Sequence, residues 1–141
     1  MIKISYKNNV SKKLEDIKKQ LGNKINMSVS DACRQCSQVW KSLMPVDTGK
    51  SRSSINYVVK KNIGLVISPT HIKPNNFYLN QFLEGLYSGK QVISAGNTTR
   101  NIIGKRKYKL RSGIFGAGEV AAQLTKPFFK GLVTDRVRGV L

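Results

Sequence analysis

The fold is decided at Pro45-Val46-Asp47-Thr48-Gly49-Lys50-Ser51-Arg52-Ser53-Ser54-Ile55, which separates two differently patterned parts of the chain. Proline lacks a backbone N–H and biases the residue before it away from helical geometry, so a preceding helix should end near Leu43 or Met44. The Asp47 side chain can bond the backbone just ahead of it, and Gly49 tolerates positive φ. The chain is therefore predicted to reverse direction here.

Upstream of this turn, apolar residues recur at steps of three and four, which predicts one long amphipathic helix over residues 11–44. Ser11 is the expected N-cap, followed by two acidic residues that suit the helix dipole. Gly22-Asn23 weakens the middle of this helix, so the sequence leaves open whether the segment forms one helix or two. The apolar positions are Leu14, Ile17, Leu21, Ile25, Val29, Ala32, Cys36, Val39 and Leu43.

Downstream of the turn, β-branched and aromatic residues predict strands. Residues 55–60 form the first expected strand, and residues 63–68 its hairpin partner. The hairpin turn lies either at Lys61-Asn62 or at Asn62 with Gly64. A helix-like spacing favours a short helix over residues 77–87.

The C-terminal half is patterned less clearly. Residues 91–94 and 107–115 are candidates for further short strands, and Pro127 is expected to open a short closing helix over residues 126–138. We therefore predict an α+β domain with a long N-terminal helix and a mainly antiparallel sheet of about four strands. Its 141 residues suit a single domain, in which the sheet occupies residues 45–125 and includes a long basic loop at about 88–113.

Positive charge is the second strong feature. Lysine and arginine number 25 against 7 acidic residues, which gives a net charge of +18 and predicts an anionic partner. Tyr108, within the densest basic cluster, is placed either to stack on a base or to anchor the loop to its own domain. The cluster itself is expected to contact DNA in a channel or neighbouring subunits, and consists of Lys105, Arg106, Lys107, Lys109 and Arg111.

Enzyme and metal motifs fail on their own requirements. Cys33, Cys36 and the single His71 are too few for a four-ligand zinc site, so we expect no metal and no cofactor. Asp47-Thr48-Gly49 occurs once, whereas aspartic proteases need two such loops. A phosphate-binding loop ending at Gly49-Lys50-Ser51 would need glycine at position 44, where methionine stands. We expect no catalytic residues, and read His71 as a loop histidine ahead of a general base.

Motifs at three places carry a family resemblance. The first is the run from Pro45 to Gly49, with Lys50, Arg52, Ser54 and Ile55, and the second is Lys126-Pro127-Phe128-Phe129. A weaker match consists of Tyr78, Phe82, Leu83, Glu84 and Gly85. In this order, over residues 12–138, the chain resembles the head-tail joining proteins of long-tailed bacteriophages, also called neck or tail-completion proteins. Ser51 and Gly131 depart from the family's usual leucine and proline.

The resemblance implies a structural virion protein that is not an enzyme. Pro45, Asp47, Thr48, Gly49, Arg52, Ile55, Pro127 and Phe128 would be its structural motif residues. It would form a homo-oligomeric ring of six copies between portal or connector proteins and the tail tube, with DNA passing through. The protein would be made in the host cytoplasm and reside at the virion neck, away from membranes, since no apolar run reaches 18 residues.

Two other classes stay open on composition. A non-sequence-specific nucleic-acid-binding accessory protein would explain the net charge of +18. A small toxin-like nuclease would use His71 as its base, although the sequence places no acidic partner beside it.

Overall fold

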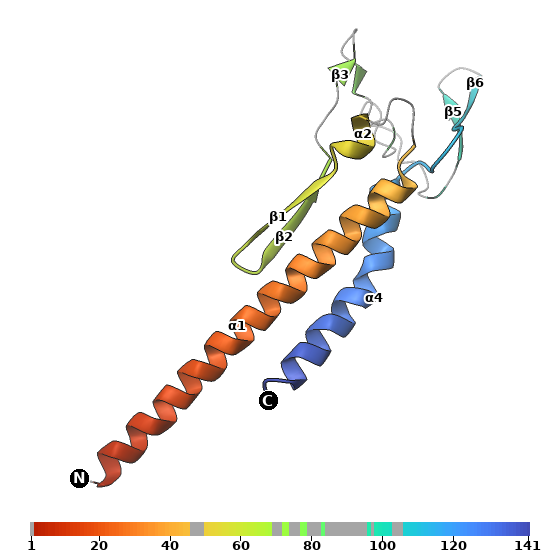
Figure 1. Cartoon of the computed structure of the whole chain (residues 1–141). Coiled ribbons are helices and arrows are strands. Elements are labelled where there is room, and N and C mark those ends of the chain that lie inside the picture. The colour runs from red at the N-terminus through yellow and green to blue at the C-terminus, as the bar shows by residue number, and fades with distance from the viewer. Residues whose placement is uncertain are drawn as a thin grey trace.

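The structure is a computed structural model that describes residues 2–45, 50–68, 72–73, 77–78, 83, 96, 98–102 and 106–141. Its largest element is helix α1, Ile2–Leu43, which at 1.5 Å per residue is about 60 Å long. The N-terminus lies at the far tip of this helix (Figure 1). The described part of the chain is therefore elongated, with the other elements gathered along one half of α1.

The C-terminal helix α4, Ala117–Arg138, runs antiparallel to α1 and lies beside its C-terminal half (Figure 1). Ala117, Ala121 and Thr125 form its buried face. Near the other end of α4, Arg136 donates to Asp31 at 2.6 Å and to the Ser28 hydroxyl at 3.3 Å. These contacts fix the axial position of one helix against the other.

Strands β1, Asn56–Lys60, and β2, Ile63–Ile67, form an antiparallel hairpin that lies along α1. Lys61 and Asn62 both have positive φ, 48° and 64°, which is the geometry of a two-residue hairpin turn. The Asn62 N–H donates to the Asn26 side chain of α1 at 3.4 Å. The hairpin and its Lys61-Asn62 turn are confirmed.

The hairpin touches α1 through Gly64. A Cβ at this position would collide with the Cys33 sulfur and lie 2.8 Å from a methyl group of Val29. The opposite face of the hairpin carries four exposed apolar side chains, Val58, Ile63, Leu65 and Ile67. Both faces of this short sheet are therefore apolar, although in the described structure only one is covered by a helix.

Four shorter strands complete the described fold. β3, Ile72–Lys73, pairs with β4, Phe77–Tyr78, and β5, Thr99–Ile102, pairs with β6, Arg106–Lys109. With β1-β2 these pairs make three separate two-stranded antiparallel sheets among the described residues. The α+β class is confirmed, whereas one sheet of about four strands is not.

The helix bounds correct the sequence prediction. The end of α1 at Leu43 is confirmed, but it begins at Ile2, so Ser11 lies inside the helix and is not its N-cap. Residues 2–21 contain no proline or glycine that would interrupt the helix. Gly22 costs about 1 kcal/mol of helix stability, which is not enough to divide α1 because packing stabilises the residues that follow it.

The predicted start of the closing helix is also wrong, because α4 begins ten residues before Pro127. Gly116, at φ 67°, has non-helical backbone geometry and immediately precedes α4. The helix starts early because buried side chains in its first turns pack against α1. Pro127 then removes one intrahelical hydrogen bond, which the packing of α4 tolerates.

Other expectations fall partly outside the described residues. The expected helix over 77–87 begins instead with strand β4, because Phe77 and Tyr78 pair with β3. Of the remaining residues only Leu83 is described, and it is helical, as predicted. Residues 91–94 lie outside the described part. The expected basic loop at 88–113 contains β5 and β6, so its described centre is a paired hairpin.

Candidate functional site

The motif that follows α1 meets the start of α4 at a small closed core. Met44 and Phe115 are fully buried there, and Ile55 is 1% exposed. Leu83 and Ala117 complete this cluster. We call it the junction, since it joins the end of α1, the start of the β1-β2 hairpin and the start of α4.

Backbone groups at the end of α1 find partners in the junction. The Ile114 N–H donates to the Leu43 carbonyl at 3.0 Å, and the Arg52 guanidinium donates to the Met44 carbonyl at 3.3 Å. These carbonyls have no acceptor role inside the helix and sit at the negative end of its dipole. Arg52, from the short helix α2, Lys50–Ser53, therefore acts as a cationic cap on α1.

Gly113 lies directly against the backbone at the end of α1. Its φ is +70°, and a Cβ there would lie 2.5 Å from the Leu43 carbonyl oxygen and 2.6 Å from the Pro45 nitrogen. Both neighbours are backbone atoms, which cannot rotate away as a side chain can. Only glycine fits this position, and the close approach is what lets Ile114 reach the helix end.

The structure brings together only some of the predicted motif residues. Pro45, Arg52 and Ile55 lie in or beside the junction. Asp47, Thr48 and Gly49 lie outside the described residues, as does the expected base His71. Pro127 and Phe128 are exposed on α4, away from the buried residues of the junction.

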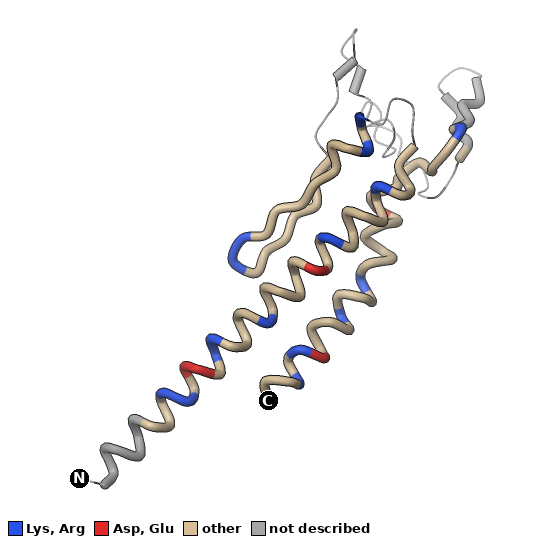
Figure 2. Tube along the Cα trace, in the orientation of Figure 1, with Lys and Arg blue, Asp and Glu red and all other residues tan. Residues whose placement is uncertain are grey.

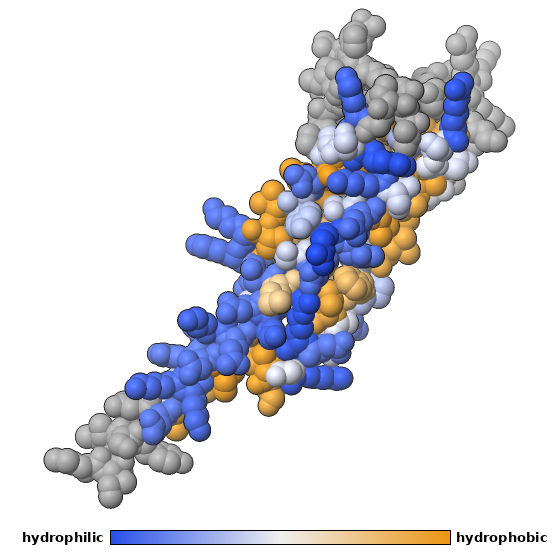
Figure 3. Space-filling view, viewed as in Figure 1, coloured by the Kyte–Doolittle hydropathy of each residue, from blue (hydrophilic) through white to orange (hydrophobic). Residues whose placement is uncertain are grey.

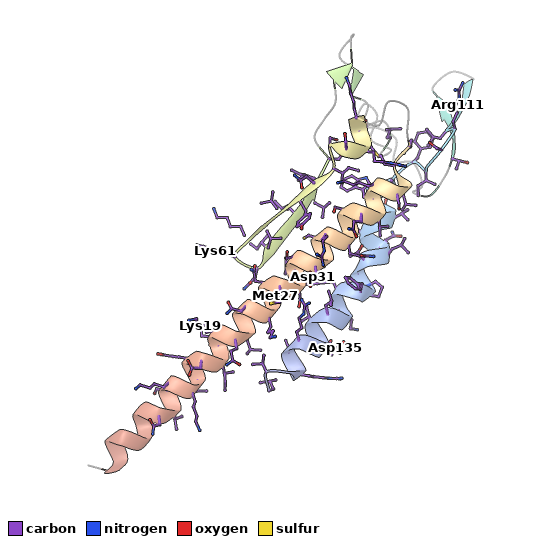
Figure 4. All side chains as sticks on the ribbon, viewed as in Figure 1. Lys19, Met27, Asp31, Lys61, Arg111 and Asp135 are labelled. Atoms are coloured by element: carbon purple, nitrogen blue, oxygen red, sulfur yellow. The ribbon has the colours of Figure 1, made fainter. Side chains whose placement is uncertain are left out.

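The basic cluster falls on the β5-β6 hairpin and just after it. Strand β6 holds Arg106, Lys107 and Lys109, while Lys105 lies outside the described residues. Arg111 follows the strand and is exposed (Figure 4). The register pairs Arg100 of β5 with Tyr108 of β6. Arg100 thus joins the cluster through strand pairing, which its distance in sequence had hidden.

Positive charge also extends over the helices. Figure 2 shows lysine and arginine along most of α1 and α4, with acidic residues at only a few points on the described trace. Asp31 is one of these acids, and it pairs with both Arg34 and Arg136 at 3.0 and 2.6 Å. The basic surface is therefore spread over the elongated body and is not confined to the predicted cluster.

The two thiols lie mid-helix, as predicted, and both are half-buried. Burial raises the pKa of Cys33, and the neighbouring Cys36 raises it further. Burial likewise raises the pKa of Cys36, partly offset by a hydrogen bond with Thr125. Raised pKa values keep both thiols protonated near neutral pH, which disfavours a nucleophilic role. Among the described residues, no three His, Cys, Asp or Glu side chains gather as a metal site would need.

An apolar groove of about 560 Å³ lies between α1, the β1-β2 hairpin and α4. Its floor includes Ala32, Cys33 and Cys36 of α1, and its walls include Val66 of the hairpin and Phe129 of α4. The sequence did not predict this groove, because its walls come from three segments far apart in the chain. The i, i+3 spacing of the cysteines on one helix face was the available signal.

Comparison with protein-family models, curated proteins and solved structures finds no match to this chain. Within the part of the chain that the structure describes, no helix has both the length and the apolar character to cross a membrane.

Proposed function

We propose that this protein is a structural component of a bacteriophage neck, which assembles as a homo-oligomeric ring joining the DNA-filled head to the tail. The support from sequence is the ordered resemblance from the Pro45 motif to the Pro127 motif. In such a role the molecule works through its shape and its surfaces, with no reacting group.

The observation that carries the proposal is that Arg52 and Ile55 of the first motif form part of the junction. Ile55 is buried, and Arg52 caps the end of α1, at 3.3 Å from the Met44 carbonyl. Arg52 and Ile55 therefore hold the start of the hairpin against the end of the long helix, which fits a building block better than an enzyme.

Exposed apolar surface supports an assembling protein as well. The outer hairpin face and α4 expose large apolar side chains, among them Ile63 at 68%, Leu65 at 61% and Leu124 at 59%. Figure 3 shows apolar side chains at the surface along the middle of the molecule, interspersed with hydrophilic ones. Patches of this kind mark protein contacts more often than they mark free surface.

Localisation tests the proposal. Antibody against the purified protein, with gold detection, should label the head-tail junction of phage particles made by cells that encode it. Particles made without the protein should accumulate as separate filled heads and tails, and adding the purified protein should join them. Label spread over the head or the tail fibre, or joining without the protein, would refute the role.

A nucleic-acid-binding accessory protein is the second candidate, favoured by the pairing of Arg100 with Tyr108 within the basic hairpin. Binding of a short duplex by the monomer, with affinity that falls steeply as salt increases, would support it. Weak binding with little salt dependence would exclude phosphate contacts as its main activity.

A further inference from the structure

The N-terminal half of α1 carries an apolar stripe that the described chain leaves uncovered. We call residues 9–25 the arm, and Val10, Leu14, Ile17 and Leu21 its stripe. Val10 is 46% exposed, Leu14 62% and Ile17 38%. Figure 4 shows this half of α1, around Lys19, with no described element beside it. Aliphatic side chains at steps of three and four on one helical face are typical of a surface that packs against a partner.

The stripe continues an interface that the chain already has. Ser28 lies seven residues, or about two helical turns, after Leu21 and therefore on the same face of α1. At Ser28 this face is covered by α4, since Arg136 of α4 donates to the Ser28 hydroxyl at 3.3 Å and to Asp31 at 2.6 Å. The arm extends past the end of α4 (Figure 1). The stripe is thus the uncovered extension of a helix-packing face, and a second helix in line with α4 would cover it.

Positive charge borders the stripe on both sides. Side chains that are neighbours on a helix surface lie three or four residues apart in sequence. By this spacing Lys13 and Lys18 border the stripe on opposite sides, and Lys24 borders its C-terminal end. Glu15 and Asp16, the acidic residues of the arm, are three or four residues from none of the stripe residues and lie on the far face. All charges that border the stripe within the arm are therefore positive.

The bordering lysines are free to receive acidic groups. Lys13, Lys18 and Lys24 are exposed and form no ion pair with another described residue. Farther along the same edge of α1 the sign is reversed, because Asp31, seven residues after Lys24, pairs with Arg136 of α4. Opposite charges on neighbouring helices attract, and like charges repel. Acidic groups are therefore the complement of the arm, where α4 supplies an arginine.

The described helices of a second copy are poor occupants of the stripe. Arg136 of α4 would meet Lys24 at the edge where it now meets Asp31. A second arm would bring its own bordering lysines against those of the first. The net charge of +18 adds a general repulsion between copies. A different and acidic protein matches the arm better than this chain does.

A flat bilayer fits the arm less well than a helix, although lysines beside an apolar stripe attract anionic lipid. α4 packs on the same face of α1, and the axes of packed helices are about 8–10 Å apart. It would therefore hold a flat surface away from the stripe. Duplex nucleic acid would contact the lysines and leave the stripe uncovered.

We propose that the arm is the docking site for an acidic amphipathic helix of a second protein, whose apolar side chains cover the stripe and whose carboxylates pair with the bordering lysines. This helix would lie in line with α4 and extend the packing of two helices along α1. The apolar contact supplies affinity, and the complementary charge selects the partner. The proposal goes beyond the neck role and does not depend on it.

Synthetic helices of three heptads test the proposal, with binding to the whole chain followed by fluorescence anisotropy. The acidic probe has leucine at the apolar heptad positions and glutamate at the positions that flank them. The basic probe has lysine in place of glutamate, and the polar acidic probe has serine in place of leucine. The wild type should bind the acidic probe at least about 10-fold more tightly than either of the other two.

Two charge variants form a matched pair. Lys13→Glu with Lys18→Glu reverses charges that border the stripe, and Lys12→Glu with Lys19→Glu reverses two on the far face. Both change the net charge equally and replace exposed residues, so circular dichroism should show both folded. The bordering variant should shift its preference towards the basic probe by at least about 10-fold, whereas the far-face variant should keep the wild-type preference.

Three results would overturn the inference. Equal binding of the acidic and the polar acidic probes would reduce the contact to a general attraction for anions. Equal shifts in the two charge variants would show that the edges of the stripe select nothing. A wild type that binds phosphatidylglycerol vesicles but not the acidic probe would make the arm a lipid contact. Failure of the neck proposal looks different, since particles would then lack the protein while the probe preferences remained.

Discussion

Replacing Gly113 with alanine tests whether the junction is as tight as its geometry implies. The alanine would have to adopt φ +70°, which costs roughly 1–2 kcal/mol for a residue with a Cβ. Its methyl group would also lie 2.5 Å from the Leu43 carbonyl oxygen and 2.8 Å from the Met44 carbonyl carbon. Overpacking of this kind costs about 1–3 kcal/mol, and towards the upper end when the neighbours are backbone. The sum is a loss of about 3–5 kcal/mol.

Two other glycines separate these effects. Gly96 has φ +93°, but a methyl group added there would meet no described atom within 4 Å, so Gly96→Ala carries the backbone strain alone, roughly 1–2 kcal/mol. Gly22 lies in α1 with open space around it and without positive φ. Gly22→Ala should therefore stabilise the protein by about 0.8–1 kcal/mol through helix propensity.

Urea unfolding followed by far-ultraviolet circular dichroism measures all three. The order of stability should be Gly22→Ala, wild type, Gly96→Ala and then Gly113→Ala, with about 2–3 kcal/mol between the last two. Thermal unfolding should follow at roughly 3 °C per kcal/mol for a chain of this size. Equal losses at Gly96 and Gly113 would show that the end of α1 moves aside, and the close approach would then be unnecessary.

Three further outcomes follow from the contacts. Gly64→Ala should destabilise the protein by about 1–3 kcal/mol, because the added methyl group would collide with Cys33. Adding Cys33→Ala should recover part of that loss, and additive losses in a double-mutant cycle would contradict the contact. Phe115→Ala, at a fully buried position, should cost about 3–5 kcal/mol in urea unfolding, and a loss below about 1 kcal/mol would show that the junction is loose. Because burial raises the pKa of Cys33, the pH midpoint of its alkylation by iodoacetamide should lie above that of free cysteine. The contribution of Cys33 to the free energy of unfolding should be complete below the ordinary thiol pKa and should be lost as pH rises through the raised pKa. An alkylation midpoint below that of free cysteine would contradict this.

Some elements follow from the sequence because neighbouring residues decide them. Pro45 ends α1 at Leu43 through its missing N–H and its effect on the residue before it. Lys61-Asn62 forms the hairpin turn because two residues that tolerate positive φ separate two apolar strands. The mid-helix position of the cysteines follows from the same periodicity that predicts the helix.

Two helix starts were mispredicted because a local start signal did not decide where the helix begins. Pro127 is a good first helical residue, yet α4 begins at Ala117, where Gly116 breaks the chain and the following side chains are buried against α1. Ser11 is a good N-cap, yet it lies within α1. At Pro127 a propensity of about 1 kcal/mol yields to the buried contacts of α4. At Ser11 the helix is exposed, and no proline or glycine in residues 2–10 prevents it from starting earlier.

The sequence by itself determined the long helix, its end at Leu43 just before Pro45, the first hairpin and the net charge of +18, since each depends on composition or on residues a few positions apart. Only the tertiary structure decided the junction around Phe115, the need for glycine at position 113 and the capping role of Arg52. It also decided that α4 packs against the C-terminal half of α1 and leaves residues 9–20 exposed. Most of these features join segments far apart in the chain, and their energies exist only when the segments meet.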